Sequence, residues 1–127
     1  MTQSFKEVYA WQKAHAFVVN VYQATKSYPQ YERFGLCSQF QRAAVSIPAN
    51  IAEGYRRDGM NDKLRFLNIA QGSLEECRDY HLLSRDLGYL YADEFEYLHQ
   101  CIEETSKFLN SYCKAIVDNV AMKDDKI

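Results

Sequence analysis

Glycine and proline are so scarce in this chain that its backbone cannot turn often. Its 127 residues include five glycines and two prolines, whereas an all-β domain needs a turn about every 8 to 12 residues. The long stretches between these few residues instead repeat apolar side chains at spacings of three and four, which is the period of an amphipathic helix. We therefore expect a few long helices, in a chain whose length is typical of one domain.

The first helix is expected to start at Ser4, where Ser4 and Glu7 fit a capping box, and to end before Pro29. Its apolar residues form two neighbouring stripes, so we expect it to bury a wide face. One stripe contains Val8, Trp11, His15, Val18, Tyr22 and Thr25, and the other contains Ala10, Ala14, Phe17, Val21 and Ala24.

The second helix, from Leu36 to about Gly54, contains Pro48 near its middle. Proline usually ends a helix, because it lacks an N–H and its ring collides with the preceding turn. The apolar repeat nevertheless keeps its phase from Ala44 to Ile51. We therefore expect one continuous helix with a kink at Pro48, in which the Ala44 carbonyl lacks its usual amide partner.

The third helix is expected to begin after Gly59, with Asn61 as its candidate cap, and to stop at Gly88. The fourth is expected to begin at a capping box formed by Asp93 and Glu96. Its apolar residues then follow an unbroken rhythm of three and four: Phe95, Leu98, Ile102, Thr105, Leu109, Tyr112, Ile116 and Asn119.

Four helices with three short connections predict an all-α fold, an antiparallel up-down-up-down four-helix bundle. We expect a single domain over residues 1–120, followed by a charged, frayed tail at 121–127. Small residues in the third helix (Ala70, Gly72 and Ser73) are expected to let another helix approach closely. The seam residues should be largely buried: Trp11, Val18, Phe40, Ile47, Ile51, Leu67, Leu74, Leu98, Ile102 and Leu109.

The N-terminal sequence does not look like a secretory signal, because no cationic start is followed by an apolar stretch. No segment approaches the roughly 18 apolar residues of a membrane span. The four cysteines include no Cys-x-x-Cys pair, which argues against a zinc ribbon or a thioredoxin-like redox motif. We expect reduced, mostly buried thiols in a cytoplasmic protein without membrane contact, at Cys37, Cys77, Cys101 and Cys113.

No pattern in the sequence predicts catalysis, a metal or a cofactor. Nucleophile-elbow, P-loop and Rossmann glycine motifs are missing. Glu96 and His99 have the Glu-x-x-His spacing of di-iron bundles, but the motif occurs once and Leu98 holds the core position. His15 and His81 lie on apolar stripes, where we expect hydrogen-bonded structural histidines. The protein is therefore expected not to be an enzyme.

The net charge of −2 is unevenly distributed along the chain. Residues 1–72 carry nine Lys or Arg and five Asp or Glu, whereas residues 73–127 carry six and twelve. Such asymmetry suits a polar assembly, but it also arises by chance on solvated helix faces. The carboxylates of Glu75, Glu76 and Asp79 are expected to form a solvated acidic face.

Cationic residues cluster around the end of the second helix, where they could neutralise phosphates, and a nearby tyrosine could stack on an unpaired base. Three acidic residues, Glu53, Asp58 and Asp62, interleave with them and keep the local charge only modestly positive. The candidate nucleic-acid-binding residues are Arg42, Arg56, Arg57, Lys63, Arg65 and Tyr55.

The stretch SQFQRAAVSIPANIAEGYRR at residues 38–57 closely resembles the 23S ribosomal RNA intervening-sequence protein family, whose members are four-helix bundles. The resemblance extends to WQKAHAF, FGLCSQ, FLNIAQGSLEE and LGYL, and covers about residues 5–117. A related branch, the accessory protein of diversity-generating retroelements, assembles into a basic homopentameric barrel that works with a reverse transcriptase and nucleic acid. Where the family often has two basic residues, this chain has Gln41 and Arg42.

The resemblance implies a non-enzymatic helical bundle that assembles with itself into a ring, with a pentamer expected, and that contacts structured RNA or an RNA-bound protein. The residues favour assembly independently, because the first and third helices each show a second apolar stripe. On the third helix this stripe contains Phe66, Ile69, Tyr80, Leu83 and Leu87. Ten tyrosines point the same way, since tyrosine is enriched at protein interfaces. The alternative is a protein–protein interaction scaffold with no nucleic-acid role.

Overall fold

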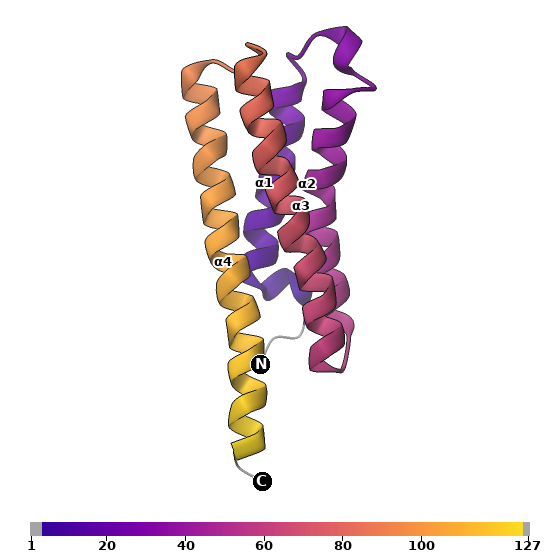
Figure 1. The fold of residues 1–127 in the computed structure, drawn as a ribbon, viewed down its shortest axis with the longest axis vertical. Coiled ribbons are helices and arrows are strands. Elements are labelled where there is room, and N and C mark those ends of the chain that lie inside the picture. Colours follow the sequence, from indigo (N-terminus) through magenta and orange to yellow (C-terminus); the bar gives the residue numbers. More distant parts are fainter. Residues whose placement is uncertain (1–3, 126–127) are drawn as a thin grey trace.

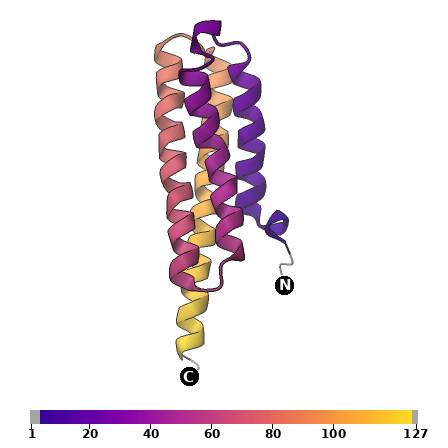
Figure 2. The ribbon, with the colours of Figure 1, turned by 90° about the vertical axis from the view of Figure 1, so that its right-hand side faces the viewer.

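The computed structural model describes the backbone of residues 4–125 and the side chains of residues 4–119. Within these residues there are four α-helices and no strand: α1 (Tyr9–Thr25), α2 (Leu36–Arg56), α3 (Met60–Asp86) and α4 (Ala92–Asp125). Two short 3-10 turns, η1 (Phe5–Glu7) and η2 (Gln30–Glu32), precede α1 and α2. Each helix packs against the next, and α4 returns to α1 (Figures 1 and 2). The expected antiparallel four-helix bundle is confirmed.

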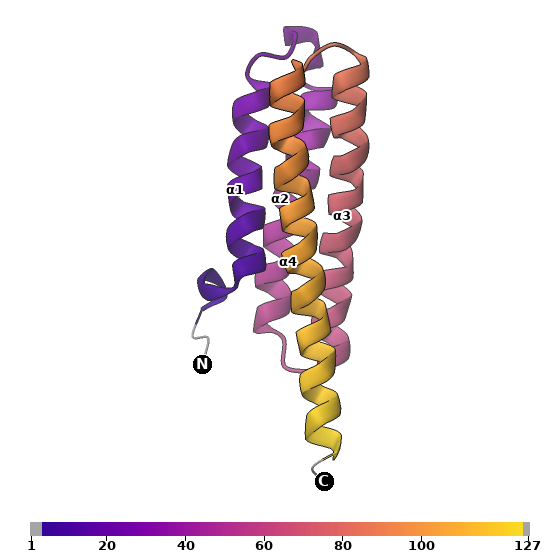
Figure 3. The same ribbon diagram turned by 90° about the vertical axis from the view of Figure 1, so that its left-hand side faces the viewer.

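The last helix projects beyond the other three at the end where α2 connects to α3 (Figures 1 and 3). Tyr9, the first residue of α1, places its ring 6.1 Å from that of Phe108, so α4 continues past the start of α1. It is helical to Asp125 and thus includes part of the segment that was expected to fray. Residues 126 and 127 lie outside the described residues, and the fraying itself stays a prediction.

The core lies where the inner faces of the four helices meet. Eight of the ten expected core residues are buried: Phe40, Ile47, Ile51, Leu67, Leu74, Leu98, Ile102 and Leu109. The prediction was wrong for Trp11 and Val18, which are only half-buried at the edge of the core. On α1 the other stripe faces inward, with Phe17 and Val21 fully buried. Its small residues Ala10 and Ala14 are buried as well, and they let the neighbouring helices approach closely.

Helix α2 is continuous through Pro48, as its unbroken apolar phase predicted. Pro48 is itself buried, between Ile47 and Ile51, which are fully buried. The kink at Pro48 and the unpaired carbonyl of Ala44 stay predictions.

Three of the expected helix caps were wrong, although α3 does begin directly after Gly59. Ser4 accepts a hydrogen bond from the Lys6 amide at 3.2 Å, but it caps η1, and α1 begins five residues later because the backbone at Val8 is extended. Asn61 lies inside α3, whose N-cap is Gly59. At α4 the Tyr91 amide donates to Glu94 at 3.0 Å, so the capping box predicted at Asp93 and Glu96 is not formed. Several residues suited to capping lie within one turn of each helix start, and the sequence alone does not show which of them caps the helix.

The end of α3 follows the prediction. Gly88 has a φ of +78°, a left-handed conformation that favours glycine. Its amide donates to the Arg85 carbonyl and the Tyr89 amide donates to the Ser84 carbonyl, both at 2.9 Å. These two bonds form a Schellman motif, which stops the helix and reverses the chain into α4.

The small residues of α3 divide into two groups. Ala70 and Ser73 are buried, and the Ser73 hydroxyl donates to Ser46 of α2 at 2.8 Å. Gly72 is exposed, and a Cβ added there would meet no atom within 4 Å. Close packing of another helix of this chain explains the first two residues but not Gly72.

Candidate nucleic-acid interface

The connection between α2 and α3 gathers most of the candidate RNA-contacting residues at one end of the bundle. Arg56 is the last residue of α2, Arg57 follows it, and Lys63 and Arg65 lie in the first two turns of α3. Arg42 lies fourteen residues before Arg56, which is about 21 Å along the axis of α2 at 1.5 Å per residue. The structure therefore brings the other candidates together and leaves Arg42 apart.

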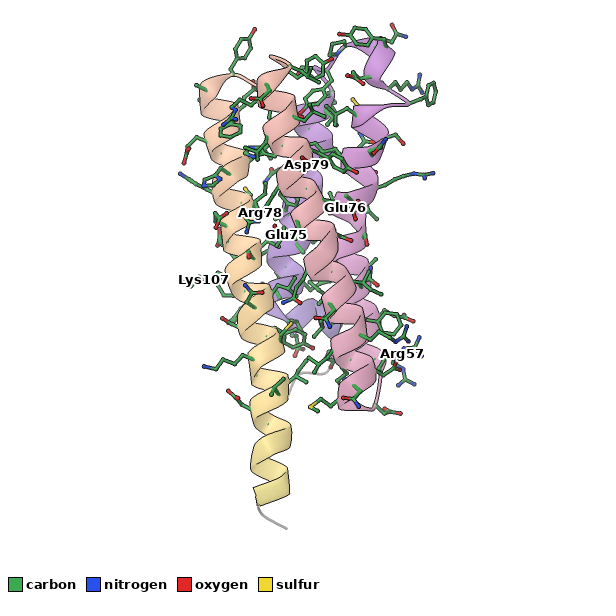
Figure 4. The ribbon with its side chains drawn as sticks, in the orientation of Figure 1. Arg57, Glu75, Glu76, Arg78, Asp79 and Lys107 are labelled. Carbon is green, nitrogen blue, oxygen red and sulfur yellow. The ribbon has the colours of Figure 1, made fainter. Side chains whose placement is uncertain are left out.

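Two of these arginines lie close to the ring of Phe66. The guanidinium carbons of Arg57 and Arg65 lie 4.8 Å and 4.4 Å from its ring centroid. Arg65 donates to Asp62 at 2.9 Å, and Arg57 pairs with Glu53 at 2.5 Å and with Asp62 at 3.8 Å. Both guanidinium charges are thus partly neutralised within the chain (Arg57 is labelled in Figure 4).

Lys63 has a clear local role at the end of α2. Its ammonium group donates to the carbonyls of Tyr55 at 2.9 Å and Gly54 at 3.3 Å. The Gly54 carbonyl also accepts from the Arg57 amide at 3.3 Å, so Lys63 is a second donor there, and a cation at the end of a helix complements the helix dipole. Tyr55 is half-buried and packs against the core, which limits how much of its ring could stack on a base.

Arg56 and Arg42 differ from the other cations. Both are exposed, and neither forms an ion pair with the side chains of residues 4–119. Arg56 lines an open hollow of about 490 Å³ at the α2–α3 connection. Arg42 lines a separate pocket of about 280 Å³ between α2 and α3, together with Ser46, Ser73 and Glu76.

Sequence reasoning missed Phe66, which it treated only as a member of an apolar stripe. A spacing signal was present, because Asp62 and Phe66 are four residues apart and Arg65 is three residues after Asp62. Residues at these spacings share one side of a helix. The contact of Arg57 with the same ring depends on how the α2–α3 connection folds back, which the spacing does not give.

The middle of α3 carries the expected solvated acidic face, since Glu75, Glu76 and Asp79 are all exposed. Arg78 lies among them and pairs with Glu75 at 2.9 Å and with Glu103 of α4 (Figure 4). The hydrogen bond from Arg78 lowers the pKa of the Glu103 carboxyl. These charges join α3 to α4 along the surface.

Burial shifts the pKa of several titratable groups in and around the core. His81 is 2% exposed, its Nε2 lies 2.9 Å from the Phe95 carbonyl oxygen, and burial lowers its pKa. It is the structural histidine that was expected, whereas His15 is exposed and stacks on Trp11. Burial raises the pKa of all four thiols: Cys37, Cys77, Cys101 and Cys113.

Two negative findings concern metals and membranes. Among the described residues, no group of three or more His, Cys, Asp or Glu side chains could hold a metal ion. None of the helices in the same part of the chain is long and apolar enough to cross a membrane.

A second surface, which we call the α1–α2 face, is formed by the outer sides of α1 and α2. Gln41 donates to the Thr25 hydroxyl at 2.9 Å, and this bond fixes how the two helices align. Val45, one turn after Gln41, therefore lies on the side of α2 that borders Tyr22 and Val18. Val45 is 42% exposed and Tyr22 44%. The surface is thus partly apolar and, in the single chain, only partly covered.

Comparison with known proteins gives one family and a structural relative. The family model described as 23S rRNA-intervening sequence protein matches residues 6–111. A crystal structure of a protein of unknown function from the S23 ribosomal protein family of Bacteroides thetaiotaomicron aligns with a TM-score of 0.76 and 25% sequence identity. The alignment covers 83% of this chain and 95% of that one. Among curated proteins, none matches this sequence.

Proposed function

This chain belongs to the 23S rRNA-intervening sequence protein family, and from this we propose that it is a non-enzymatic homo-oligomer of helical bundles that contacts structured RNA. The α2–α3 end would make the RNA contact. The α1–α2 face would take part in assembly. A cytoplasmic location is part of the proposal.

The observation that carries the RNA contact is the guanidinium of Arg56 at the end of α2, which is exposed and forms no ion pair with the described side chains. Its neighbours Arg57 and Arg65 present further guanidinium groups around Phe66. Arginine is well suited to phosphate, because its planar group donates two parallel hydrogen bonds.

The support for assembly comes from the α1–α2 face and from the family resemblance. Tyr22 and Val45 remain more than two-fifths exposed, and a second copy would cover them. The related accessory protein forms a homopentameric barrel, so we propose a ring and expect five copies.

The RNA contact is tested by filter binding of a structured RNA at several salt concentrations. Arg56→Gln should weaken binding and lower the salt dependence by about one released counterion, as for one lost phosphate contact. The matched control is Lys107→Gln, which removes one exposed positive charge from α4 (Figure 4) and should change neither quantity. Absence of binding by the wild-type protein even at low salt would reject the RNA contact.

A second candidate function is a protein-interaction scaffold without RNA. The ion pairs of Arg57 and Arg65 with Glu53 and Asp62 favour it, because they consume much of the positive charge at the α2–α3 end. The net charge of −2 favours it as well. Under this alternative the protein assembles and the RNA binding is absent at every salt concentration.

We propose no catalytic activity, because the groups that most often serve as nucleophile or base are unsuited to it. Burial raises the pKa of each thiol, so the thiols stay protonated at neutral pH. The Nε2 of His81 is held by a backbone carbonyl in the core.

A further inference from the structure

We propose that a pocket between α2 and α3 binds a small α-amino acid, whose carboxylate pairs with Arg42 and whose ammonium group pairs with Glu76. We call this site the Arg42 pocket, and its lining includes Gln39, Arg42, Ser46, Ser73, Glu76 and Tyr80. Arg42 lies about 21 Å along α2 from Arg56. The Arg42 pocket is therefore separate from the proposed RNA contact at the α2–α3 end.

The pocket presents two opposite charges that do not neutralise each other. Arg42 and Glu76 both line it, yet neither of them forms an ion pair with any side chain of residues 4–119. The next arginine along the same surface behaves differently, since Arg78 pairs with Glu75 at 2.9 Å. The charges of Arg42 and Glu76 are thus available to a ligand that carries the opposite charges itself.

Ser46 adds a hydrogen-bond donor on the α2 side of the pocket. Its hydroxyl oxygen accepts from Ser73 at 2.8 Å and from Asn50 at 3.0 Å. A serine hydroxyl has two acceptor lone pairs and one O–H, so these bonds occupy both lone pairs and leave the O–H to donate. Ser46 lies one turn after Arg42 and therefore on the same side of α2. A carboxylate has two oxygens, and it can accept from the guanidinium and from this hydroxyl together.

Glu76 supplies an acceptor on the α3 side. The Tyr80 hydroxyl, one turn further along α3, donates to Gln39 of α2 at 3.1 Å and lies 3.5 Å from Oε2 of Glu76. Oε1 of Glu76 accepts no hydrogen bond from the described residues. In Figure 4 Glu76 lies on the side of α3 towards α2, whereas its neighbour Glu75 lies towards α4. A carboxylate held at one oxygen and free at the other suits an ammonium group.

The two charges determine the class of the ligand. Glu76 would repel a phosphate group, and Arg42 would repel a divalent cation. A molecule with one carboxylate and one ammonium group satisfies both residues and is neutral overall. A free α-amino acid carries both groups on one carbon atom, whereas the two termini of a peptide lie apart.

The size of the pocket indicates a small ligand. Its volume is about 280 Å³, which is slightly below the range of about 300 to 1,000 Å³ for pockets that hold drug-sized molecules. A small amino acid such as alanine fits this space.

The test compares L-alanine with two analogues that each lack one charge. Propionate is alanine without its amine, and ethylamine is alanine without its carboxylate. Isothermal titration calorimetry of the full chain at neutral pH, in a buffer free of phosphate, amines and carboxylates, measures each affinity. We expect L-alanine to bind in the millimolar range and each analogue at least about tenfold more weakly, as for the loss of one hydrogen-bonded charge. Inorganic phosphate and Mg²⁺ should not compete with L-alanine.

Substitutions in the pocket locate the site. Arg42→Gln and Glu76→Gln should each weaken L-alanine binding at least about tenfold. In Arg42→Gln the affinity for L-alanine should fall to that for ethylamine, because the carboxylate has lost its partner. In Glu76→Gln it should fall to that for propionate. Both residues are exposed, so circular dichroism should show both variants to be fully helical.

The matched controls remove the same charges elsewhere on the same helices. Arg56→Gln removes an exposed arginine of α2 without an ion pair, and Glu75→Gln removes the exposed neighbour of Glu76. Both should bind L-alanine like wild type. Arg56→Gln should nevertheless weaken the binding of RNA, so the proposed RNA contact and the amino-acid site fail separately.

Four outcomes would overturn the proposal. Propionate or ethylamine that binds as tightly as L-alanine would reject recognition of both charges. Competition by inorganic phosphate would indicate an anion site instead. L-Alanine binding that persists unchanged in Arg42→Gln and Glu76→Gln would place the ligand elsewhere. A wild-type protein that does not bind L-alanine even at high millimolar concentration would reject the site altogether.

Discussion

The two halves of the bundle, α1 with α2 and α3 with α4, bury similar cores but present very different surfaces. We call α3 with α4 the charged half. Helices α1 and α2 carry four charged residues along their whole length: Lys13, Arg42, Glu53 and Arg56. Helix α3 alone carries nine. Among the described side chains, the ion pair of Arg78 with Glu103 joins α3 to α4, whereas a hydrogen bond between the neutral side chains of Gln41 and Thr25 joins α2 to α1.

This difference shows that the packing of the core and the charge of the surface are independent of each other. Phe17 and Ile47 in the first half are as completely buried as Leu67 and Leu109 in the second, so the core does not depend on the surface charges. A half that is charged outside suits water, and a half that is uncharged outside suits another protein. The contrast therefore bears on assembly, not on folding.

The largest expected effects come from truncating fully buried core residues, which should destabilise the protein in either half. Ile47→Ala on α2 and Leu109→Ala on α4 should each lower the free energy of unfolding by about 2 to 5 kcal/mol, because each truncation leaves a cavity in a fully packed site. Urea denaturation followed by circular dichroism measures both. Val18→Ala is the control on α1, and its loss should be smaller because Val18 is half-buried. A loss at Ile47 or Leu109 no greater than at Val18 would show that the core is not shared by the two halves.

Val18 also shows where the sequence is insufficient to predict the fold. The three-and-four repeat predicted every helix, the antiparallel arrangement and most of the core. On α1, however, two stripes of similar hydrophobicity lie side by side, and periodicity does not rank them. The choice depends on where α2 and α4 sit, and the stripe with small Ala10 and Ala14 is the one that lets both come close.

The candidate site was predictable only as a set of nearby cations. Arg56, Arg57, Lys63 and Arg65 are close in sequence across a short connection, so their proximity follows from the sequence alone. Their partners do not, because Lys63 reaches back to the carbonyls at the end of α2 through a folded connection. Arg42 was grouped with them by composition, although the rise of the helix places it about 21 Å away.

The next effect concerns His81, a histidine of α3 that is buried in the core. Burial lowers the pKa of His81 below its ordinary value of 6.5, so the unfolded chain binds this proton more readily than the folded one. Stability should therefore be full above pH 6.5 and fall as the pH is lowered towards the depressed value. His81→Gln should cost about 1 to 3 kcal/mol at neutral pH through the disturbed hydrogen bond to Phe95, and it should flatten the pH dependence.

The comparison for His81 is His99→Gln, because His99 is exposed on α4 and its ring centroid lies 6.3 Å from that of His81. Besides burial, the charge of His99 helps to lower the pKa of His81, so His99→Gln should weaken the pH dependence of stability without removing it. Thermal unfolding at several pH values between 5 and 8 measures both variants. An unchanged slope in His81→Gln would show that another group governs the pH dependence.

A smaller loss of stability is expected from replacing glycine in the connections between helices, and it should differ between the α3–α4 and the α2–α3 connections. Gly88, between α3 and α4, has a φ of +78°, and Gly88→Ala should cost about 1 to 2 kcal/mol because a Cβ is strained in this conformation. Gly59, between α2 and α3, has a φ of −85° and open space around it, so Gly59→Ala should cost less. Equal losses in thermal unfolding would mean that the Schellman motif at Gly88 does not limit stability.

The smallest effect tests the charged surface itself. The ion pair of Arg78 with Glu103 is partly exposed, with side-chain exposures of 28% and 50%, and such pairs contribute about 0.2 to 1 kcal/mol. A double-mutant cycle with Arg78→Gln and Glu103→Gln isolates this coupling. It should shrink at 1 M salt, where the Debye length is about 3 Å, and neither variant should change the oligomer. Assembly through the α1–α2 face should not weaken at 1 M salt, because salt does not screen the burial of uncharged surface. A coupling that persists at high salt, or an oligomer that dissociates when Arg78 is replaced, would place the charged half in the interface and contradict the division between the two halves.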